Sequence, residues 1–171
     1  MKKKTRALTL SALFSALTMM SLFFATLWPS GEYGLAAFSS IFVAAAVIEG
    51  GLAAGIYVYA CSAILSLLLL PVRAAPLLYA LFFGYYPVVK SLIEHIKMLP
   101  LQWILKLCVF NAALTLIYIF LRELIFDFED IKPGFLVICL AGSAVFALFD
   151  YGFSKVIRLY EYRIHGKFTG R

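Results

Sequence analysis

The chain has 171 residues, of which 64% are hydrophobic and only 14% charged, and its formal net charge at pH 7 is +6. Residues 7–28, 52–70 and 107–121 contain no charged side chain. A bilayer core of roughly 30 Å is crossed by about 20 apolar residues in a helix, so each of these segments can span a membrane. The composition excludes most soluble enzymes and predicts one all-α integral membrane domain over residues 1–171.

In chain order, the apolar segments predict a bundle of six transmembrane helices. The first covers residues 7–28 and ends before Pro29. Residues 34–70 carry a single charge, Glu49, and one helix of that length would measure roughly 55 Å, which is too long for the bilayer core. The sequence Glu49-Gly50-Gly51 therefore predicts a break between helices at 34–48 and 51–70. The remaining helices are expected at 75–94, with a kink at Pro87, at 101–122 and at 133–155.

The basic residues predict how the bundle is oriented. Lysine and arginine gather in residues 1–6 and again after residue 153, whereas the loop at 123–132 is mainly acidic. Short cytoplasmic segments of membrane proteins are enriched in lysine and arginine. We therefore expect a multi-pass protein of the cell membrane with both termini cytoplasmic and in contact with membrane lipid. Because no nucleic-acid motif accompanies the charge, nucleic acid is not an expected partner.

The helix at 101–122 carries a polar stripe, because its polar residues recur at spacings of four, three and four. The members are Asn111, Thr115, Tyr118 and Arg122. Polar groups at membrane depth usually face the bundle interior or a cavity. The stripe predicts either one wall of a binding pocket or a hydrogen-bond network that only stabilises the bundle.

Aromatic residues on the helix at 75–94 supply a second candidate wall, through Tyr79 and Phe83. Aromatic walls with a few convergent polar groups are typical of small-molecule pockets. We expect such a pocket near the outer surface, between the helices at 75–94, 101–122 and 133–155 and under the loop at 30–33. Trp28 and Glu32 are the candidates from that loop.

Small residues mark one face of the first helix, where Ala12 and Ala16 lie four residues apart beside Ser11 and Ser15. Small residues at this spacing let another helix backbone approach closely. The face predicts either packing inside the bundle or docking of another membrane protein.

Charged residues inside the spans gather in the half of the bundle expected to be cytoplasmic. They are Glu49, Lys90, Glu94, Lys106 and Asp150. Asp150 can pair with Lys90, Lys106 or Lys155. This set is expected to stabilise the bundle or to face a protein partner rather than to line a substrate path.

No pattern of catalytic, metal-binding or nucleotide-binding residues occurs in the sequence. His95 and His165 lack a paired metal-ligand spacing, and the three cysteines are isolated in apolar runs. Neither G-x-x-x-x-G-K-[ST] nor G-x-S-x-G is present. We therefore expect no enzymatic activity, no cofactor and no metal, and any active transport must take its energy from a partner.

The sequence Ala12-Leu-Phe-Ser-Ala16, together with the chain length and the predicted helices, resembles the substrate-binding S components of energy-coupling factor transporters. The glycine-rich turn before residue 51, the proline-bounded loop at 71–76 and the stretch 81–90 are also similar. In that family an A-x-x-x-A element docks on a coupling membrane subunit, and two ATPase subunits supply the energy.

The resemblance implies a subunit that captures a small organic, vitamin-like molecule at the outer face and topples in the membrane to release it. It implies docking through Ala12 and Ala16, and no histidine-rich N-terminus of the nickel or cobalt type is present. The alternative is a non-catalytic membrane scaffold of the cell-shape (MreD-like) type, which needs partner surfaces but no outer pocket.

Overall fold

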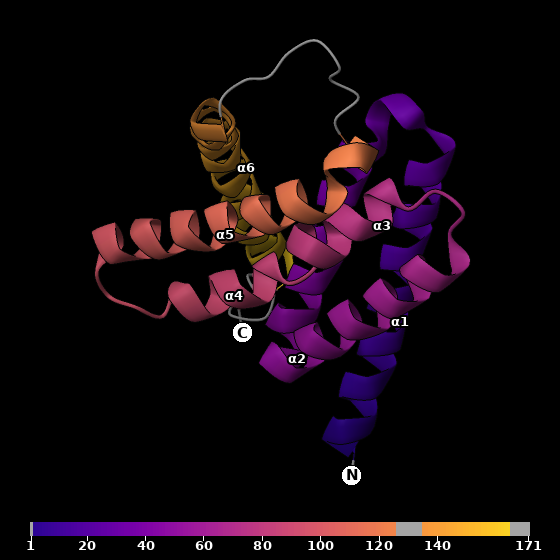
Figure 1. The fold of residues 1–171 in the computed structure, drawn as a ribbon. Coiled ribbons are helices and arrows are strands. Elements are labelled where there is room, and N and C mark those ends of the chain that lie inside the picture. The colour runs from indigo at the N-terminus through magenta and orange to yellow at the C-terminus, as the bar shows by residue number, and fades with distance from the viewer. Residues whose placement is uncertain (1, 126–134, 165–171) are drawn as a thin grey trace.

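The computed structural model describes residues 2–125 and 135–164, and within these ranges the chain is entirely helical apart from short turns (Figure 1). This confirms the all-α prediction. In chain order the elements are α1 (Lys2–Leu27), a 3₁₀ turn η1 (Pro29–Gly31), α2 (Glu32–Leu69), α3 (Ala74–Leu78), a π-helical turn η2 (Tyr79–Phe83), α4 (Tyr86–Ile93), α5 (Leu99–Ile125) and α6 (Phe135–Ile164).

Five helical segments among the described residues are long and apolar enough to cross a membrane. They are Ala7–Leu27, Glu32–Leu69, Ala74–Ile93, Leu99–Tyr118 and Cys139–Arg163. This count is one fewer than the six predicted, because Glu32–Leu69 is a single element in the structure. The element α6 also continues well beyond residue 155, where the sequence predicted its end.

The long element α2 is interrupted at Gly51, where the sequence predicted a break. Gly51 has φ 81° and ψ 178°, a backbone conformation essentially reserved for glycine. In a continuous helix, residues 47 and 55 would be separated by about 12 Å. Instead, a Cβ atom placed on Gly55 would lie 2.3 Å from the Cγ2 atom of Val47. The chain therefore folds back at Gly51, and the absence of a side chain at Gly55 permits the close approach.

The predicted helix at 75–94 is divided into α3, η2 and α4, with the irregular part just before Pro87. The Gly84 amide donates to the Tyr79 carbonyl at 2.7 Å, which closes a π-type turn. Pro87 cannot donate a backbone hydrogen bond and is the second residue of α4, in the first turn where the amide has no helical partner. The hydroxyl of Tyr59, from α2, donates to the Ala80 carbonyl at 2.8 Å and satisfies an acceptor in the distorted turn. The regular helix is thus interrupted just before Pro87, where the sequence predicted a kink.

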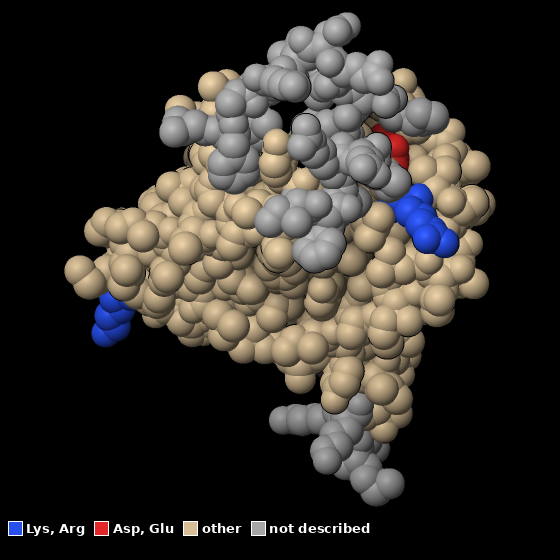
Figure 2. All heavy atoms as spheres, in the orientation of Figure 1, with Lys and Arg blue, Asp and Glu red and all other residues tan. Residues whose placement is uncertain are grey.

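Helices α1 and α2 pack closely on each other through small side chains, and much of the remaining surface is apolar. Ser21 of α1 donates to the Leu35 carbonyl of α2 at 3.1 Å, and the buried Thr18, Ser39 and Ser40 donate to carbonyls of their own helices. Large apolar side chains face outward, and Leu68 and Leu148 are 76% and 75% exposed. Figure 2 shows a surface that is uncharged over most of one face. An apolar exterior around a polar-containing core is the arrangement expected of a protein surrounded by lipid.

Candidate functional site

An apolar cavity of about 500 Å³ lies between the start of α2, the α3–η2 segment, α5 and α6. Phenylalanine rings form much of its wall, and Tyr33 and Tyr118 also line it. The rings of Phe82, Phe110, Phe146 and Phe149 belong to this wall. A volume of this size is typical of small-molecule sites, which are lined mainly by apolar and aromatic side chains.

The wall of the apolar cavity is held in place by contacts between aromatic rings from different elements. Phe110 of α5 stacks on Phe146 of α6, with ring centroids 4.6 Å apart and planes at 13°. Phe82 of η2 meets both rings edge to face, at 5.4 Å and 5.9 Å. Gly142 allows α6 to approach α5, because a Cβ atom there would lie 2.9 Å from Leu114 Cδ1. These contacts bring η2, α5 and α6 together around the cavity.

Of the residues predicted to line a pocket, Phe83 and Tyr118 line this cavity. Asn111 and Thr115 do not. Asn111 donates to the Leu107 carbonyl at 2.9 Å and to Ser143 Oγ at 3.3 Å, and Thr115 donates to the Asn111 carbonyl at 2.7 Å. Short polar side chains in helices commonly bond to the preceding turn. The contacts of Asn111 and Thr115 match the alternative prediction for the polar stripe, a hydrogen-bond network within the bundle.

The other predicted pocket residues lie elsewhere. Tyr79 is fully buried, and its hydroxyl is 2.7 Å from Ser62 Oγ on α2. The Glu32 carboxylate accepts a hydrogen bond from the Ala75 amide at 2.8 Å, which joins the start of α2 to α3. Trp28 is 66% exposed and lines a separate groove between α1 and α2. The side chain of Arg122 lies outside the described residues.

The small residues on α1 divide between two faces. Ser11 is buried, whereas Ala12 and Ala16 are exposed. The pair is therefore accessible to another helix, and its docking role stays a prediction.

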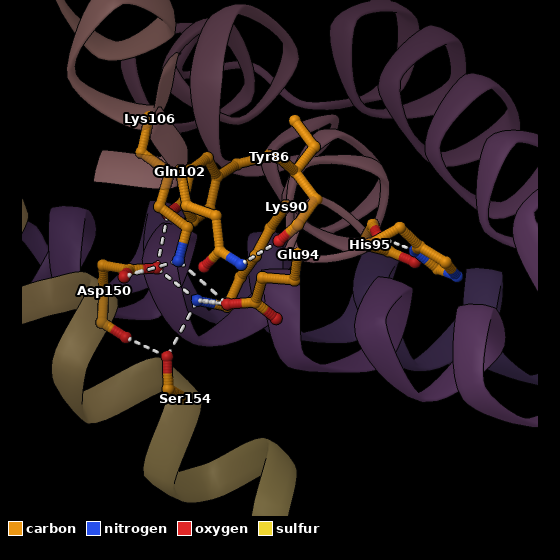
Figure 3. A network of polar contacts seen from close by, with 10 residues as sticks. Tyr86, Lys90, Glu94, His95, Gln102, Lys106, Asp150 and Ser154 are labelled. Atoms are coloured by element: carbon orange, nitrogen blue, oxygen red, sulfur yellow. Dashed lines mark hydrogen bonds and ion pairs between the residues drawn. The ribbon is translucent and has the colours of Figure 1, made fainter. Parts of the chain in front are cut away.

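A network of charged and polar side chains, most of them buried, lies next to the aromatic wall and connects α4, α5 and α6 (Figure 3). Its members, here called the charge network, are Tyr86, Lys90, Glu94, Lys106, Asp150 and Ser154. Asp150 Oδ1 accepts from Lys90 and from the Tyr86 hydroxyl, and Asp150 Oδ2 accepts from Lys106 at 3.1 Å. Glu94 Oε1 lies 2.8 Å from the ammonium nitrogen of each lysine.

Two lysines face two carboxylates, so the charge network is neutral as a whole. Lys90, Lys106 and Asp150 are 2%, 5% and 3% exposed. Lys90 also donates to Ser154 Oγ at 2.8 Å, so its three donor hydrogens meet acceptors from Asp150, Glu94 and Ser154. Buried charges are tolerated only when they are paired and hydrogen-bonded in this way. The pairings of Asp150 with Lys90 and Lys106 are two of the three that the sequence predicted.

Glu94 lies just beyond the apolar segment that ends at Ile93. Burial alone would raise the pKa of its carboxyl, but the hydrogen bonds from Lys106 and Lys90 outweigh that effect and hold the pKa below its ordinary value. Glu94 is therefore a carboxylate at neutral pH.

Tyr86 connects the charge network to the apolar cavity. Its ring lies 5.2 Å from Phe82 and 5.4 Å from Phe146, both of which line the cavity, while its hydroxyl donates to Asp150. A signal for this wall was present in the sequence, because Phe146 and Phe149 lie three residues apart on α6, with Phe153 one helical turn further on. Sequence reasoning missed it by attending to the polar stripe of the neighbouring helix.

Comparison with known proteins found no matching family model, no matching curated protein and no matching solved structure.

Proposed function

We propose that this protein is a membrane-embedded binding subunit for a small organic molecule, and that the apolar cavity is its binding site. The observation that carries the proposal is a cavity of about 500 Å³ walled by rings from η2, α5 and α6. Its composition favours a ligand with a ring or a compact hydrocarbon body. The lining is almost entirely apolar, so contacts with the rings rather than hydrogen bonds would hold the ligand.

We place this activity in an uptake transporter of the energy-coupling factor type, with the chain as the substrate-capture S component. Support comes from the exposed Ala12 and Ala16 on α1, and from the sequence resemblance already described. The coupling membrane subunit and the ATPase subunits would be separate proteins, and no enzymatic step belongs to this chain. A cell-shape scaffold would need no small-molecule ligand, so ligand binding distinguishes the two functions.

The orientation that this function requires is six membrane crossings, with both termini cytoplasmic and the 123–132 loop outside. Support comes from the reversal of α2 at Gly51, which makes two antiparallel halves of one element, and from the basic residues at both ends. A cysteine placed at Glu129 in a background lacking the three native cysteines should react with an impermeant reagent on intact cells. Reaction only after lysis would contradict this orientation.

The test of binding is extraction of small molecules from the protein purified out of its host membrane, with a cavity-filling variant for comparison. Ala37 lines the cavity, and Ala37→Phe adds a ring to it. Ala53 is exposed on the same helix and outside the cavity, so Ala53→Phe is the matched control. We expect one non-lipid compound to accompany the wild type and Ala53→Phe, and to be lost from Ala37→Phe. If all three proteins carry only phospholipid, the binding proposal is wrong and the scaffold function is favoured.

A further inference from the structure

A second cavity, of about 240 Å³, is lined by the first half of α2, by α4 and by α6. It is here called the polar cavity, because charged side chains take part in its lining: Lys90, Glu94 and Glu161. Glu94 and Glu161 are exposed, so water reaches this cavity. The first half of α2, the α3–η2–α4 segment and α6 thus contribute to both the polar and the apolar cavity.

The two cavities follow one another along these segments. On α6, Phe149 lines the apolar cavity and Ile157 lines the polar cavity, and Phe153 lies between them at spacings of four residues. On α2, the lining of the apolar cavity ends at Ala37 and that of the polar cavity begins at Ala44. Residues at spacings of three and four share one face of a helix. The cavities are therefore arranged in series, separated by about two turns, or roughly 12 Å, of α6.

Three aromatic rings lie between the two cavities, and they are here called the aromatic barrier: Tyr86, Phe149 and Phe153. Phe149 stacks on Phe153, with ring centroids 5.4 Å apart and planes at 20°. The ring of Tyr86 lies 5.9 Å and 6.2 Å from these two rings. Tyr86 and Phe153 are 0% and 4% exposed. The aromatic barrier therefore closes the connection between the cavities in this structure.

The Tyr86 ring is held by one hydrogen bond and follows an irregular part of the backbone. Its hydroxyl donates to Asp150 (Figure 3). Tyr86 is the first residue of α4 and comes directly after η2 and the turn at 84–85, so no continuous α-helix connects it to α3. Interrupted helices at membrane depth are a feature of many transporters. A shift of α4 that breaks the bond to Asp150 would withdraw the Tyr86 ring from the barrier.

We propose that the two cavities are the two ends of one passage through the chain, that the aromatic barrier is its gate, and that the bond from Tyr86 to Asp150 holds the gate closed. The passage would carry a compact, ring-containing molecule from the apolar cavity to the polar cavity, where water reaches it. This inference rests on the function proposed for the apolar cavity and adds the route of release. The ligand crosses the chain itself, whereas the family resemblance implies that the whole subunit topples.

The test measures passage with p-chloromercuribenzenesulfonate, a thiol reagent with an aromatic ring and a sulfonate group that keeps it from crossing lipid. Ser91 lines the polar cavity, and Ser91→Cys is made in the full-length protein lacking the three native cysteines. Lys97 is exposed in the turn after α4 and outside the cavity lining. The reagent is applied to the membrane face from which Lys97→Cys does not react, so that it reaches Ser91→Cys only through the chain.

We expect Ser91→Cys to react slowly when the barrier is wild type, and at least about tenfold faster when it is combined with Tyr86→Phe. That substitution keeps the ring but removes a hydrogen bond to a charged group. Tyr79→Phe is the matched control, because Tyr79 is also 0% exposed but its hydroxyl meets Ser62 Oγ, away from the barrier. It should leave the rate unchanged, whereas Phe153→Ala, which removes a barrier ring, should raise it.

The proposal is overturned if Ser91→Cys does not react from this face with any of these barriers, or if Tyr79→Phe accelerates the reaction as much as Tyr86→Phe does. The binding function is decided separately, by the compound extracted from the purified protein. A bound compound without reaction of Ser91→Cys would therefore refute the passage alone. Reaction through the chain of a protein that carries only phospholipid would refute the binding function alone.

Discussion

The substitution Asp150→Asn should destabilise the protein strongly, because Asp150 is the carboxylate on which the charge network converges. It accepts from Tyr86, Lys90 and Lys106, and it is 3% exposed. The asparagine would leave two buried lysines facing only Glu94, so the network would carry a net positive charge. Removing one partner of a buried ion pair typically costs about 3–5 kcal/mol. The asparagine oxygen can still accept one hydrogen bond, which reduces the loss. We therefore expect the free energy of unfolding to fall by an amount near the lower end of this range, about 3 kcal/mol.

The loss can be measured by equilibrium unfolding in mixed micelles of a mild detergent and sodium dodecyl sulfate, followed by the fluorescence of the two tryptophans. Restoring neutrality should recover part of it. We therefore expect the double variant Lys90→Met with Asp150→Asn to be more stable than the sum of the single effects predicts, by about 0.5–3 kcal/mol. Glu161→Gln is the control, because Glu161 is exposed on the same helix and should stay within about 0.5 kcal/mol of the wild type. An Asp150→Asn variant as stable as that control would refute the reasoning.

Three further outcomes follow from individual residues. Ala12→Leu with Ala16→Leu should block assembly with a coupling subunit in a co-purification assay while leaving thermal stability unchanged, because both alanines are exposed; normal assembly would remove their docking role. Gly51→Ala should cost about 1–3 kcal/mol in detergent unfolding because of its backbone conformation, whereas Gly152→Ala, in open space on α6, should be neutral or stabilising; equal effects would contradict the reversal. The pKa of Glu94 is lowered in the folded protein, so its contribution to stability is present above the unfolded-state pKa and is lost as pH falls through the folded one. Unfolding curves from pH 7 to pH 3 should show this loss in the wild type and a smaller one in Glu94→Gln, and parallel curves would count against it.

The features of the fold that follow from backbone chemistry could be predicted from the sequence. Gly50-Gly51 marked the reversal of α2, and Pro87 marked the irregular segment before α4. These effects depend little on the surrounding structure: glycine alone tolerates the conformation at Gly51, and proline lacks an amide hydrogen.

The site was harder to predict, because its wall depends on which helix faces meet. Asn111 and Thr115 suggested a polar wall, but their side chains are satisfied by carbonyls of their own helix and by Ser143. Spacing along one helix shows that polar groups share a face, but not whether they bond locally or face a cavity. Similarly, the sequence offered three lysine partners for Asp150. Lys155 was the wrong one, because its ammonium group lies over the ring of Tyr151 instead, 5.4 Å from the ring centroid.

The central claim is that the apolar cavity holds a small organic molecule, and an experimental structure of the protein purified without added ligand tests it most directly. We expect compact density enclosed among Phe82, Phe110 and Phe146. Elongated density that enters from the surrounding lipid and continues out of the cavity would contradict the claim, because it would identify the occupant as an acyl chain.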